Sequence, residues 1–155
     1  MNILKSVLTL ILLISTISAN AQQPSNHDLE LQREGILDKN FRYTNSPKVS
    51  QLYRDTTAVL NQSTPVNMGD GVKMIQALQM PSIAIYTYSL PIQKNQFTPT
   101  MERYIKQQAP TLKTTFCYQV NKHIHYKVNN RQEKYIYVDR QNQMLTEITL
   151  KASQC

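Results

Sequence analysis

The chain has 155 residues, of which 17 are Lys or Arg and 10 are Asp or Glu, so its formal net charge is +7. This length suits one domain of ordinary size, and a hydrophobic content of 41% is enough for a packed core, which excludes a wholly disordered chain. Two cysteines and three glycines exclude a disulfide-dense scaffold and a collagen-like repeat.

The first 21 residues have the pattern of a secretory signal peptide. Lys5 precedes the apolar run 7–14, and small residues follow up to the triplet Ala19-Asn20-Ala21. The apolar run is shorter than the ~20 residues needed to cross a bilayer, which argues against a membrane-spanning helix. No cysteine stands near the expected cleavage point after Ala21, so a bacterial lipoprotein anchor is not indicated. We therefore expect a periplasmic or secreted protein of the Gram-negative type, without a transmembrane anchor after cleavage.

The remaining chain divides into a leader and one domain. Residues 22–45 are expected to form an N-terminal leader that is polar over 22–27 and ambiguous over 28–41, where a short helix fits part of the pattern. Residues 46–155 are expected to form a single α+β domain.

Two helices are predicted from the same pair of residue types at their starts. Ser46-Pro47 and Thr98-Pro99 each combine an N-cap hydroxyl with a proline suited to the first helical position. Apolar residues then recur at helical spacing. Pro110 stands inside the second helix, so a kink or break is expected near Gln108-Ala109.

Four strands are predicted in two hairpins. The first pair, 72–78 and 82–90, follows the turn cluster 67–71, and 82–90 is rich in β-branched and aromatic residues. The second pair, 134–138 and 144–151, encloses a polar turn. Hairpins pair their strands antiparallel.

The segment 118–131 is compatible with two structures. Ile124, Tyr126 and Val128 alternate as in a strand, whereas Val120 and Ile124 share a helical face with Cys117. With either outcome, the order of elements predicts an α+β fold in two layers. Its antiparallel sheet of about four strands would pack against two or three helices.

Cys117 and Cys155 are the only cysteines in the chain. An even number of cysteines in an exported chain indicates a disulfide, which here would hold the last residue against the middle of the chain. A redox pair would require a Cys-x-x-Cys arrangement, which the sequence lacks. The structural role is therefore the prediction.

The region from Leu60 to Cys155 combines a proline near the end of a helix, an aspartate before a strand, two Tyr-x-Tyr strands and a helix ending in cysteine. The residues are Pro65, Asp70, Tyr86, Tyr88, Cys117, Tyr135, Tyr137, Asp139 and Cys155. This pattern resembles small, mostly uncharacterised exported α+β proteins of Gram-negative bacteria. The resemblance implies a helix after the first cysteine and a glycine in the last turn, where Asn142 stands here. It brings no catalytic residues.

His123 and His125 are the strongest candidates for metal ligands. On a strand, both imidazoles would point to one side and could share a Cu²⁺, Ni²⁺ or Zn²⁺ ion. A metal site normally needs three or four ligands, the only other histidine is His27 in the leader, and Lys122 and Lys127 would repel a cation. We therefore expect no bound metal and no cofactor.

Sequence motifs for catalysis are missing. The chain has no Gly-x-Ser-x-Gly, His-Glu-x-x-His or phosphate-loop motif. A small hydrolase is the least favoured hypothesis, because it would require the fold to bring together two carboxylates from distant parts of the sequence. No nucleic-acid-binding module is recognisable, so no specific nucleic-acid partner is expected.

Positive charge and tyrosines gather in the C-terminal part, where residues 99–155 hold nine basic and four acidic side chains. If the two Tyr-x-Tyr strands are neighbours, their rings share one sheet face, which is either core or binding surface. The predicted binding surface comprises Tyr86, Tyr88, Tyr135, Tyr137, Lys122, Lys127, Arg131, Lys134 and Arg140.

The favoured function is therefore a non-enzymatic envelope protein that binds another envelope protein. It would be an accessory or assembly factor or an immunity-type inhibitor. The alternative is a module that binds an anionic envelope surface or polymer, and such binding weakens as salt concentration rises.

Overall fold

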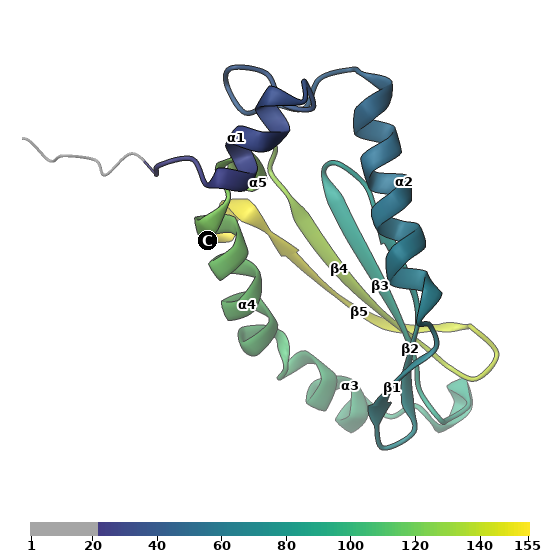
Figure 1. Ribbon diagram of the computed structural model, residues 1–155. Helices are drawn as coiled ribbons and strands as arrows, with labels where there is room; N and C mark the ends of the chain where they lie inside the picture. Colours follow the sequence, from purple (N-terminus) through teal and green to yellow (C-terminus); the bar gives the residue numbers. More distant parts are fainter. Residues whose placement is uncertain (1–21) are drawn as a thin grey trace, which may run out of the picture.

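A computed structural model describes residues 22–155, and the predicted signal peptide, 1–21, lies outside the described residues. Figure 1 shows a twisted sheet with one long helix along one side and a chain of helices along the other. The elements are α1 (Asn26–Arg33), α2 (Pro47–Gln62), β1 (Val66–Gly69), β2 (Val72–Gln79), β3 (Ile83–Ser89), α3 (Pro99–Lys106), α4 (Ala109–Lys122), α5 (Ile124–Val128), β4 (Gln132–Val138) and β5 (Met144–Lys151). Short 3₁₀ turns occupy Lys94–Gln96 and Ala152–Gln154. The predicted α+β class is confirmed.

The five strands form one sheet in the order β1-β2-β3-β4-β5. Both predicted hairpins, β2–β3 and β4–β5, pair antiparallel as expected. The sheet differs from the prediction in two details: β1 adds a fifth strand beside β2, and β3 pairs parallel with β4. The parallel pair arises because the connection through α3, α4 and α5 returns the chain to the end of the sheet where β3 began.

The predicted turn cluster 67–71 includes the end of β1. Asp70 and Gly71 join β1 to β2, with φ of 49° and 77°, and Gly69 before them has φ of 97°. Asp-Gly is a preferred pair where both central residues of a two-residue hairpin need positive φ. The turn is therefore tighter than expected, and the residues before it pair with β2.

Both predicted helix starts are present. Pro47 and Pro99 lie in the first turns of α2 and α3, and the Thr98 hydroxyl accepts a hydrogen bond from the Met101 amide at 3.3 Å. Ser46 occupies the N-cap of α2 without a side-chain capping bond. The expected break near Gln108-Ala109 is confirmed, since α3 ends at Lys106 and α4 begins at Ala109.

The ambiguous segment 118–131 is helical, as the resemblance implied. Helix α4 continues to Lys122 with Phe116 and Val120 buried, and α5 follows after His123. The backbone amides of Ile124 and His125 each donate to the Asp28 carboxylate at 3.2 Å. Asp28 on α1 therefore satisfies the first amides of α5, an interaction between residues distant in sequence that local periodicity does not contain.

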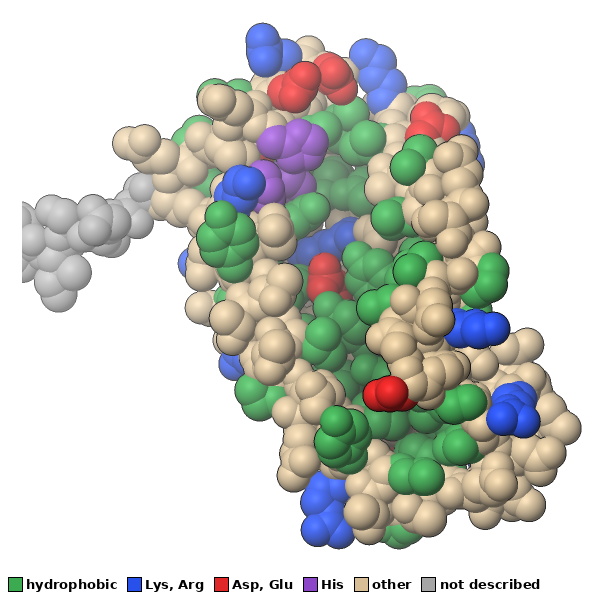
Figure 2. Space-filling model, turned by 60° about the horizontal axis from the view of Figure 1, so that its bottom comes forward, with side chains coloured by type: hydrophobic (Ala, Val, Ile, Leu, Met, Phe, Trp, Pro, Cys, Tyr) green, Lys and Arg blue, Asp and Glu red, His purple; other side chains and the backbone are tan. Residues whose placement is uncertain are grey.

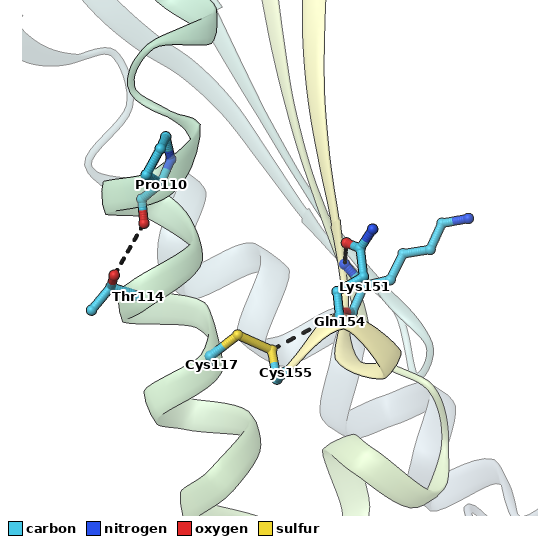
Figure 3. The surroundings of a disulfide bond; sticks show 6 residues. All are labelled: Pro110, Thr114, Cys117, Lys151, Gln154 and Cys155. Carbon is cyan, nitrogen blue, oxygen red and sulfur yellow. Dashed lines mark hydrogen bonds between the residues drawn. A yellow bond between two sulfur atoms is a disulfide. The ribbon is translucent and has the colours of Figure 1, made fainter.

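The disulfide joins Cys117 on α4 to Cys155, with an S–S distance of 2.07 Å (Figure 3). It lies beside the larger core cluster, where Ile105, Phe116 and Val120 of the helices pack with Ile148 and Leu150 of β5. The helices α3 and α4 thus cover the β5 side of one sheet face, and the bridge ties the last residue to that layer.

A second, smaller core cluster holds the N-terminal elements together. Leu31, Ile36 and Leu37 pack with Val49 of α2, and all four are buried. Residues 22–27 fall in the predicted polar leader, but the Ser25 hydroxyl and the Asp28 carboxylate form a capping box that begins α1 at Asn26.

Candidate binding groove and histidine cluster

The four tyrosines of the two Tyr-x-Tyr strands lie on one face of the sheet. Tyr86 is opposite Tyr135 and Tyr88 is opposite Tyr137 in the parallel β3–β4 pair. Their rings are stacked, with centroids 5.6 and 5.5 Å apart. The geometric expectation for neighbouring Tyr-x-Tyr strands is confirmed. We call the hollow above these rings the tyrosine groove.

The tyrosine groove runs between α2 on one side and α3 and α4 on the other. Figure 2 shows this hollow with hydrophobic side chains along its floor. Tyr135 is buried, whereas Tyr86, Tyr88 and Tyr137 are half-buried. The sequence left open whether this sheet face is core or binding surface. In the structure, one tyrosine of the floor is core and three remain partly accessible.

One end of the groove is an apolar pocket of about 490 Å³ between the sheet and α3. Tyr137 and Leu90 contribute from the sheet, and Met101, Tyr104 and Ile105 contribute from α3. Met101 and Tyr104 are 40% and 68% exposed, so large apolar side chains at this end face solvent. A contiguous exposed apolar surface of this kind commonly marks a binding site.

The other end of the groove contains a buried arginine. Arg131 is 4% exposed, donates to the Gln79 side chain at 2.7 Å and to the Met80 carbonyl, and lies over the rings of Tyr53 and Tyr126. Stacking on tyrosine rings and hydrogen bonds to oxygen atoms stabilise the buried guanidinium. Arg131 therefore has a structural role at the wall of the groove.

The tyrosine rings of the groove floor are uncharged at neutral pH, and the Glu133 carboxylate lies on the same face of β4. Burial raises the pKa of Tyr88 to about 12, with a further contribution from Tyr137. Burial likewise raises the pKa of Tyr86 and of Tyr135, which also donates to the Glu133 carboxylate at 2.6 Å. Neutral rings favour apolar contacts and hydrogen bonding over attraction of an ion.

The predicted basic residues are not gathered around the groove. Lys134 alternates with Tyr135, so it lies on the opposite sheet face, where its Nζ is 3.2 Å from Glu147. Lys122 and Lys127 are exposed on α4 and α5. Arg140 is exposed in the β4–β5 turn. Of the predicted surface, the structure brings together the four tyrosines and Arg131.

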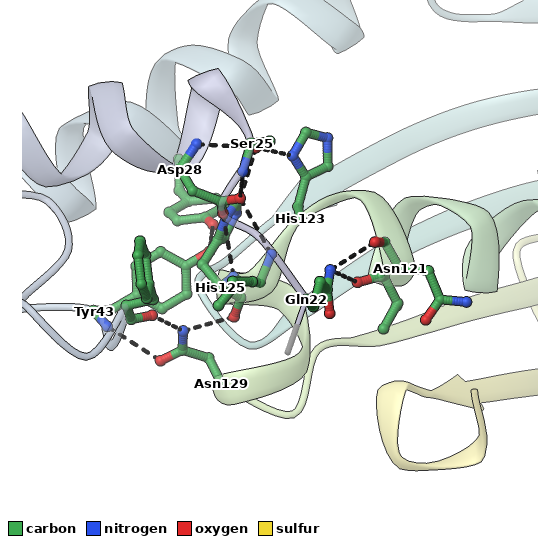
Figure 4. A network of polar contacts seen from close by, with 12 residues as sticks. Gln22, Ser25, Asp28, Tyr43, Asn121, His123, His125 and Asn129 are labelled. Atoms are coloured by element: carbon green, nitrogen blue, oxygen red, sulfur yellow. Dashed lines mark hydrogen bonds and ion pairs between the residues drawn. The ribbon is translucent and has the colours of Figure 1, made fainter. Parts of the chain in front are cut away.

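Polar groups from the N-terminal segment meet the α4–α5 junction in a second cluster (Figure 4). The Asp28 carboxylate bonds the Nδ1 atom of His125, and the Ser25 hydroxyl lies 2.9 Å from Nδ1 of His123. His27 packs edge-on against both histidine rings. We call His27, His123 and His125 the histidine cluster.

Burial and hydrogen bonding determine the charge in this cluster. Burial would raise the pKa of Asp28, but hydrogen bonds from Ser25 and His125 outweigh it and hold that pKa well below the usual range. Burial lowers the pKa of His125 and of His123, although the Asp28 carboxylate acts in the opposite direction on both. At neutral pH, the Asp28 carboxylate therefore lies beside neutral imidazoles at His123 and His125.

Sequence reasoning missed three contributors to these sites. Helical spacing puts Met101 and Tyr104 on the apolar face of the helix that begins at Pro99, which predicts burial, but in the structure both line the pocket beside the sheet and remain exposed. His27 was placed in a loose leader, although the Ser25-x-x-Asp28 capping pattern is present in the sequence. That pattern was a usable signal that His27 would lie on a helix.

Comparisons with solved structures found three similar folds. The first is a protein of Pseudomonas aeruginosa described as secreted, with 12% identity and a TM-score of 0.45 over 72% of this chain and 99% of that chain. The second is the type II secretion system pilotin AspS of Vibrio cholerae, with 12% identity and a TM-score of 0.46 over 70% of this chain and 93% of that chain. The third is the type 2 secretion system pilotin EpsS of Vibrio vulnificus, with 15% identity and a TM-score of 0.48 over 72% of this chain and 97% of that chain. No family model matches the chain, and no curated protein matches it. At these sequence identities and TM-scores, the similarity does not indicate what this chain does.

No helix within residues 22–155 combines the length and apolar character needed to cross a membrane.

Proposed function

We propose that this chain is an exported, non-enzymatic protein that binds an apolar segment of another envelope protein in the tyrosine groove. The observation that carries this proposal is the apolar pocket beneath Met101 and Tyr104, which continues into the row of stacked tyrosines. Tyrosine and methionine are enriched at protein interfaces, and a groove between a helix and a sheet suits an amphipathic segment.

The shape and chemistry of the groove favour a protein segment. Its floor offers neutral tyrosine hydroxyls beside apolar ring faces, and its pocket of about 490 Å³ has room for large side chains of a partner. Burial of the exposed parts of Met101 and Tyr104 would remove apolar surface from water, which stabilises the complex. An accessory factor and an immunity-type inhibitor would both use such a surface.

Binding of an anionic envelope surface or polymer is the second candidate. It is supported by the excess of basic side chains after residue 98. The opposite placement of Lys134 and its pairing with Glu147 weaken it, because a polyanion needs several free cations on one side.

A small hydrolase ranks third. The Glu133 carboxylate accepts a hydrogen bond from Tyr135, and the Glu102 carboxylate accepts one from Thr146 at 3.0 Å. Both are therefore engaged by neighbouring side chains in the described fold.

The proposal is tested by site-specific photocrosslinking in cells that export the chain. A photoreactive phenylalanine analogue replaces Tyr104 at the groove, and the matched control replaces Tyr118. Tyr118 is 64% exposed and lies two residues from the buried Phe116 and Val120, on the opposite side of α4. We expect a defined protein adduct from position 104, absent from position 118, and mass spectrometry identifies the partner.

The charge substitutions Met101→Glu and Tyr118→Glu complete the test. Met101→Glu places a carboxylate in the apolar pocket, so it should abolish the adduct formed from position 104, whereas Tyr118→Glu should leave it unchanged. An adduct that forms equally from both positions, or that persists with Met101→Glu in a folded protein, would overturn the groove as the binding site.

A further inference from the structure

One carboxylate lies on the floor of the tyrosine groove. Glu133 precedes Tyr135 by two residues and Tyr137 by four on β4, so alternation puts the three side chains on one sheet face. Glu133 is half-buried, and its Oε2 atom accepts a hydrogen bond from the Tyr135 hydroxyl at 2.6 Å. Figure 2 shows an acidic side chain within the hollow. Building on the groove as the proposed binding site, we propose that Glu133 binds a lysine or arginine side chain of the partner segment.

The Glu133 carboxylate has no cationic partner within residues 22–155. Both ion pairs of these residues join other side chains. Arg131, two residues earlier, donates to the Gln79 side chain and the Met80 carbonyl instead. The Tyr135 hydroxyl is a single neutral donor, whereas a carboxylate has about four acceptor positions. Most of the hydrogen-bonding capacity of Glu133 is therefore left for water or for a partner.

The carboxylate determines the sign of the potential over this part of the floor. Burial is the largest cause of the raised pKa of Tyr86, Tyr88 and Tyr135, and the charge of Glu133 raises all three further. Arg131 acts in the opposite direction on Tyr86 alone of the three, and less strongly than Glu133. The floor around these rings is therefore negative. Ring faces of tyrosine accept a neighbouring cation, as two other rings do around Arg131.

Covering of the groove by a partner would remove Glu133 from water. A buried carboxylate without a compensating charge is strongly destabilising, whereas a lysine or arginine placed against it compensates the lost hydration. A wholly apolar segment would leave Glu133 unpaired, and an acidic one would be repelled. Glu133 is thus a specificity-determining residue, which selects against such segments as well as for a basic one.

The distance from Glu133 to the apolar pocket gives the spacing expected in the partner. Tyr137 lines the pocket and lies four residues further along β4, which corresponds to roughly 13 Å. The cation should therefore be about four residues from the side chain that fills the pocket if the segment is extended. In a helical segment, the separation should be about nine residues.

This pairing differs from the binding of an anionic polymer in the sign of the partner's charge. One ion pair that the partner shields from water is also screened little by salt, whereas polyanion binding uses many exposed cations of this chain.

The test uses the adduct that forms from the photoreactive residue at position 104 of the full exported chain. Glu133→Gln keeps the shape of the side chain and an oxygen that accepts from Tyr135, so only the charge is lost. The adduct yield should fall at least about 5-fold. Glu147→Gln, on the opposite sheet face, is the matched control and should leave the yield unchanged.

The melting temperature separates a binding role from a structural one. Because Glu133 pairs with no cation of the described chain, Glu133→Gln should melt no lower than the original chain. A residue that served only the fold would lower the melting temperature and the adduct yield together.

Charge exchange identifies the partner's cation. Mass spectrometry of the adduct locates the bound segment, and its lysine or arginine at the expected spacing is replaced with glutamate. This change should abolish the adduct with the original chain. Glu133→Lys should also abolish it, and the two substitutions together should restore it, because the pair is then present with its charges reversed.

The outcomes distinguish failure of this pairing from failure of the groove. An adduct from position 104 that is undiminished in folded Glu133→Gln would overturn the pairing and leave the groove in place. So would a bound segment without lysine or arginine, or the absence of rescue by charge exchange. An adduct that forms equally from positions 104 and 118 would overturn the groove, and the pairing with it.

Discussion

Single residues at the turns carry conformations that few side chains tolerate. Asn142, in the turn between β4 and β5, has φ of 62°, in the left-handed region. Glycine adopts this region without steric cost, and asparagine adopts it more readily than other residues. The glycine that the resemblance implies in this turn is therefore replaced here by the side chain best suited to the same backbone.

The effect of a substitution at Asn142 on stability should depend on how well the new residue tolerates positive φ. Asn142→Gly should leave the free energy of unfolding nearly unchanged, whereas Asn142→Ala should lower it by about 1 kcal/mol, because alanine keeps a Cβ but lacks the short polar side chain whose local hydrogen bonding makes positive φ tolerable for asparagine. Urea denaturation measures both. Gln141→Ala, in the same turn at ordinary φ, is the control, and an equal loss in Gln141→Ala would contradict the explanation.

Asp139 organises the same turn through its carboxylate. It accepts hydrogen bonds from the amides of Gln141 and Gln143, both at 2.8 Å, and of Lys94 at 3.1 Å. Burial would raise the pKa of Asp139, but these three amide donors outweigh it and lower that pKa. The charged carboxylate is thus a link between the β4–β5 turn and the segment after β3.

This lowered pKa predicts a pH-dependent stability. Because the pKa of Asp139 is lower in the folded than in the unfolded state, its stabilisation is present above about pH 4 and is lost as the pH falls through the folded-state value. Asp139→Asn should lower the melting temperature at pH 7, and the difference from the original chain should shrink below about pH 4. Asp70→Asn, in the exposed β1–β2 turn, should show no such convergence.

At the scale of elements, α2 protects the sheet edge that β1 leaves open. β1 pairs only with the first part of β2, from Val72 to Met74. Beyond it, the Asn61 side chain accepts from the Ala77 amide at 2.8 Å and donates to its carbonyl at 2.7 Å. The Thr57 hydroxyl accepts from the Gln79 amide at 2.9 Å. Helix side chains thus replace the missing strand partner.

Removal of the Asn61 side chain should expose this edge. Asn61→Ala leaves the buried Ala77 amide and carbonyl without these partners, which should cost about 1–3 kcal/mol of unfolding free energy. Hydrogen exchange of the Ala77 amide should also accelerate. Gln62→Ala, at the next and exposed position, is the control. Unchanged exchange at Ala77 would show that α2 does not protect the edge.

The disulfide is the other inter-element constraint. It closes a loop with a sequence separation of 38 residues between α4 and the end of the chain. Replacing both cysteines with serine should lower the free energy of unfolding by roughly 4 kcal/mol, because the unfolded chain gains conformational freedom. Denaturation with and without reductant measures this. The double variant should not respond to reductant, whereas the original chain should approach it.

At the scale of the whole molecule, the polar and apolar sites lie at opposite ends of one groove. The tyrosine rows connect the apolar pocket near Tyr137 to the end near Gln79, whose amide donates to the Tyr86 hydroxyl at 3.3 Å. Basic residues are spread over both sheet faces and the helices. The positive charge is therefore distributed over the whole surface and is not concentrated in one patch.

This distribution predicts a weak dependence of partner binding on salt. The yield of the adduct from position 104 should change less than about twofold between about 50 mM and about 500 mM NaCl, because apolar contacts are not screened by ions. Binding of an anionic polymer through many cations would fall steeply over the same range. A steep loss of the adduct would favour the second candidate function.

Local patterns were sufficient for the parts of the fold that local physics determines. Proline after a hydroxyl residue starts α2 and α3, Pro110 separates α3 from α4, and alternation identifies the strands of both hairpins. The Tyr-x-Tyr repeats also predicted four rings on one sheet face if the two strands were neighbours, which the β3–β4 pair confirms.

Contacts between distant segments decided the rest. The direction of β4 relative to β3 depends on where three helices return the chain, and no local pattern encodes it. Helix α5 begins after His123, where a carboxylate on α1 satisfies the amides of Ile124 and His125. The same contact brings His27 to His123 and His125. By itself, the sequence determined the class of elements and the residues available, whereas only tertiary structure decided which of them meet, because convergence of side chains depends on three-dimensional packing.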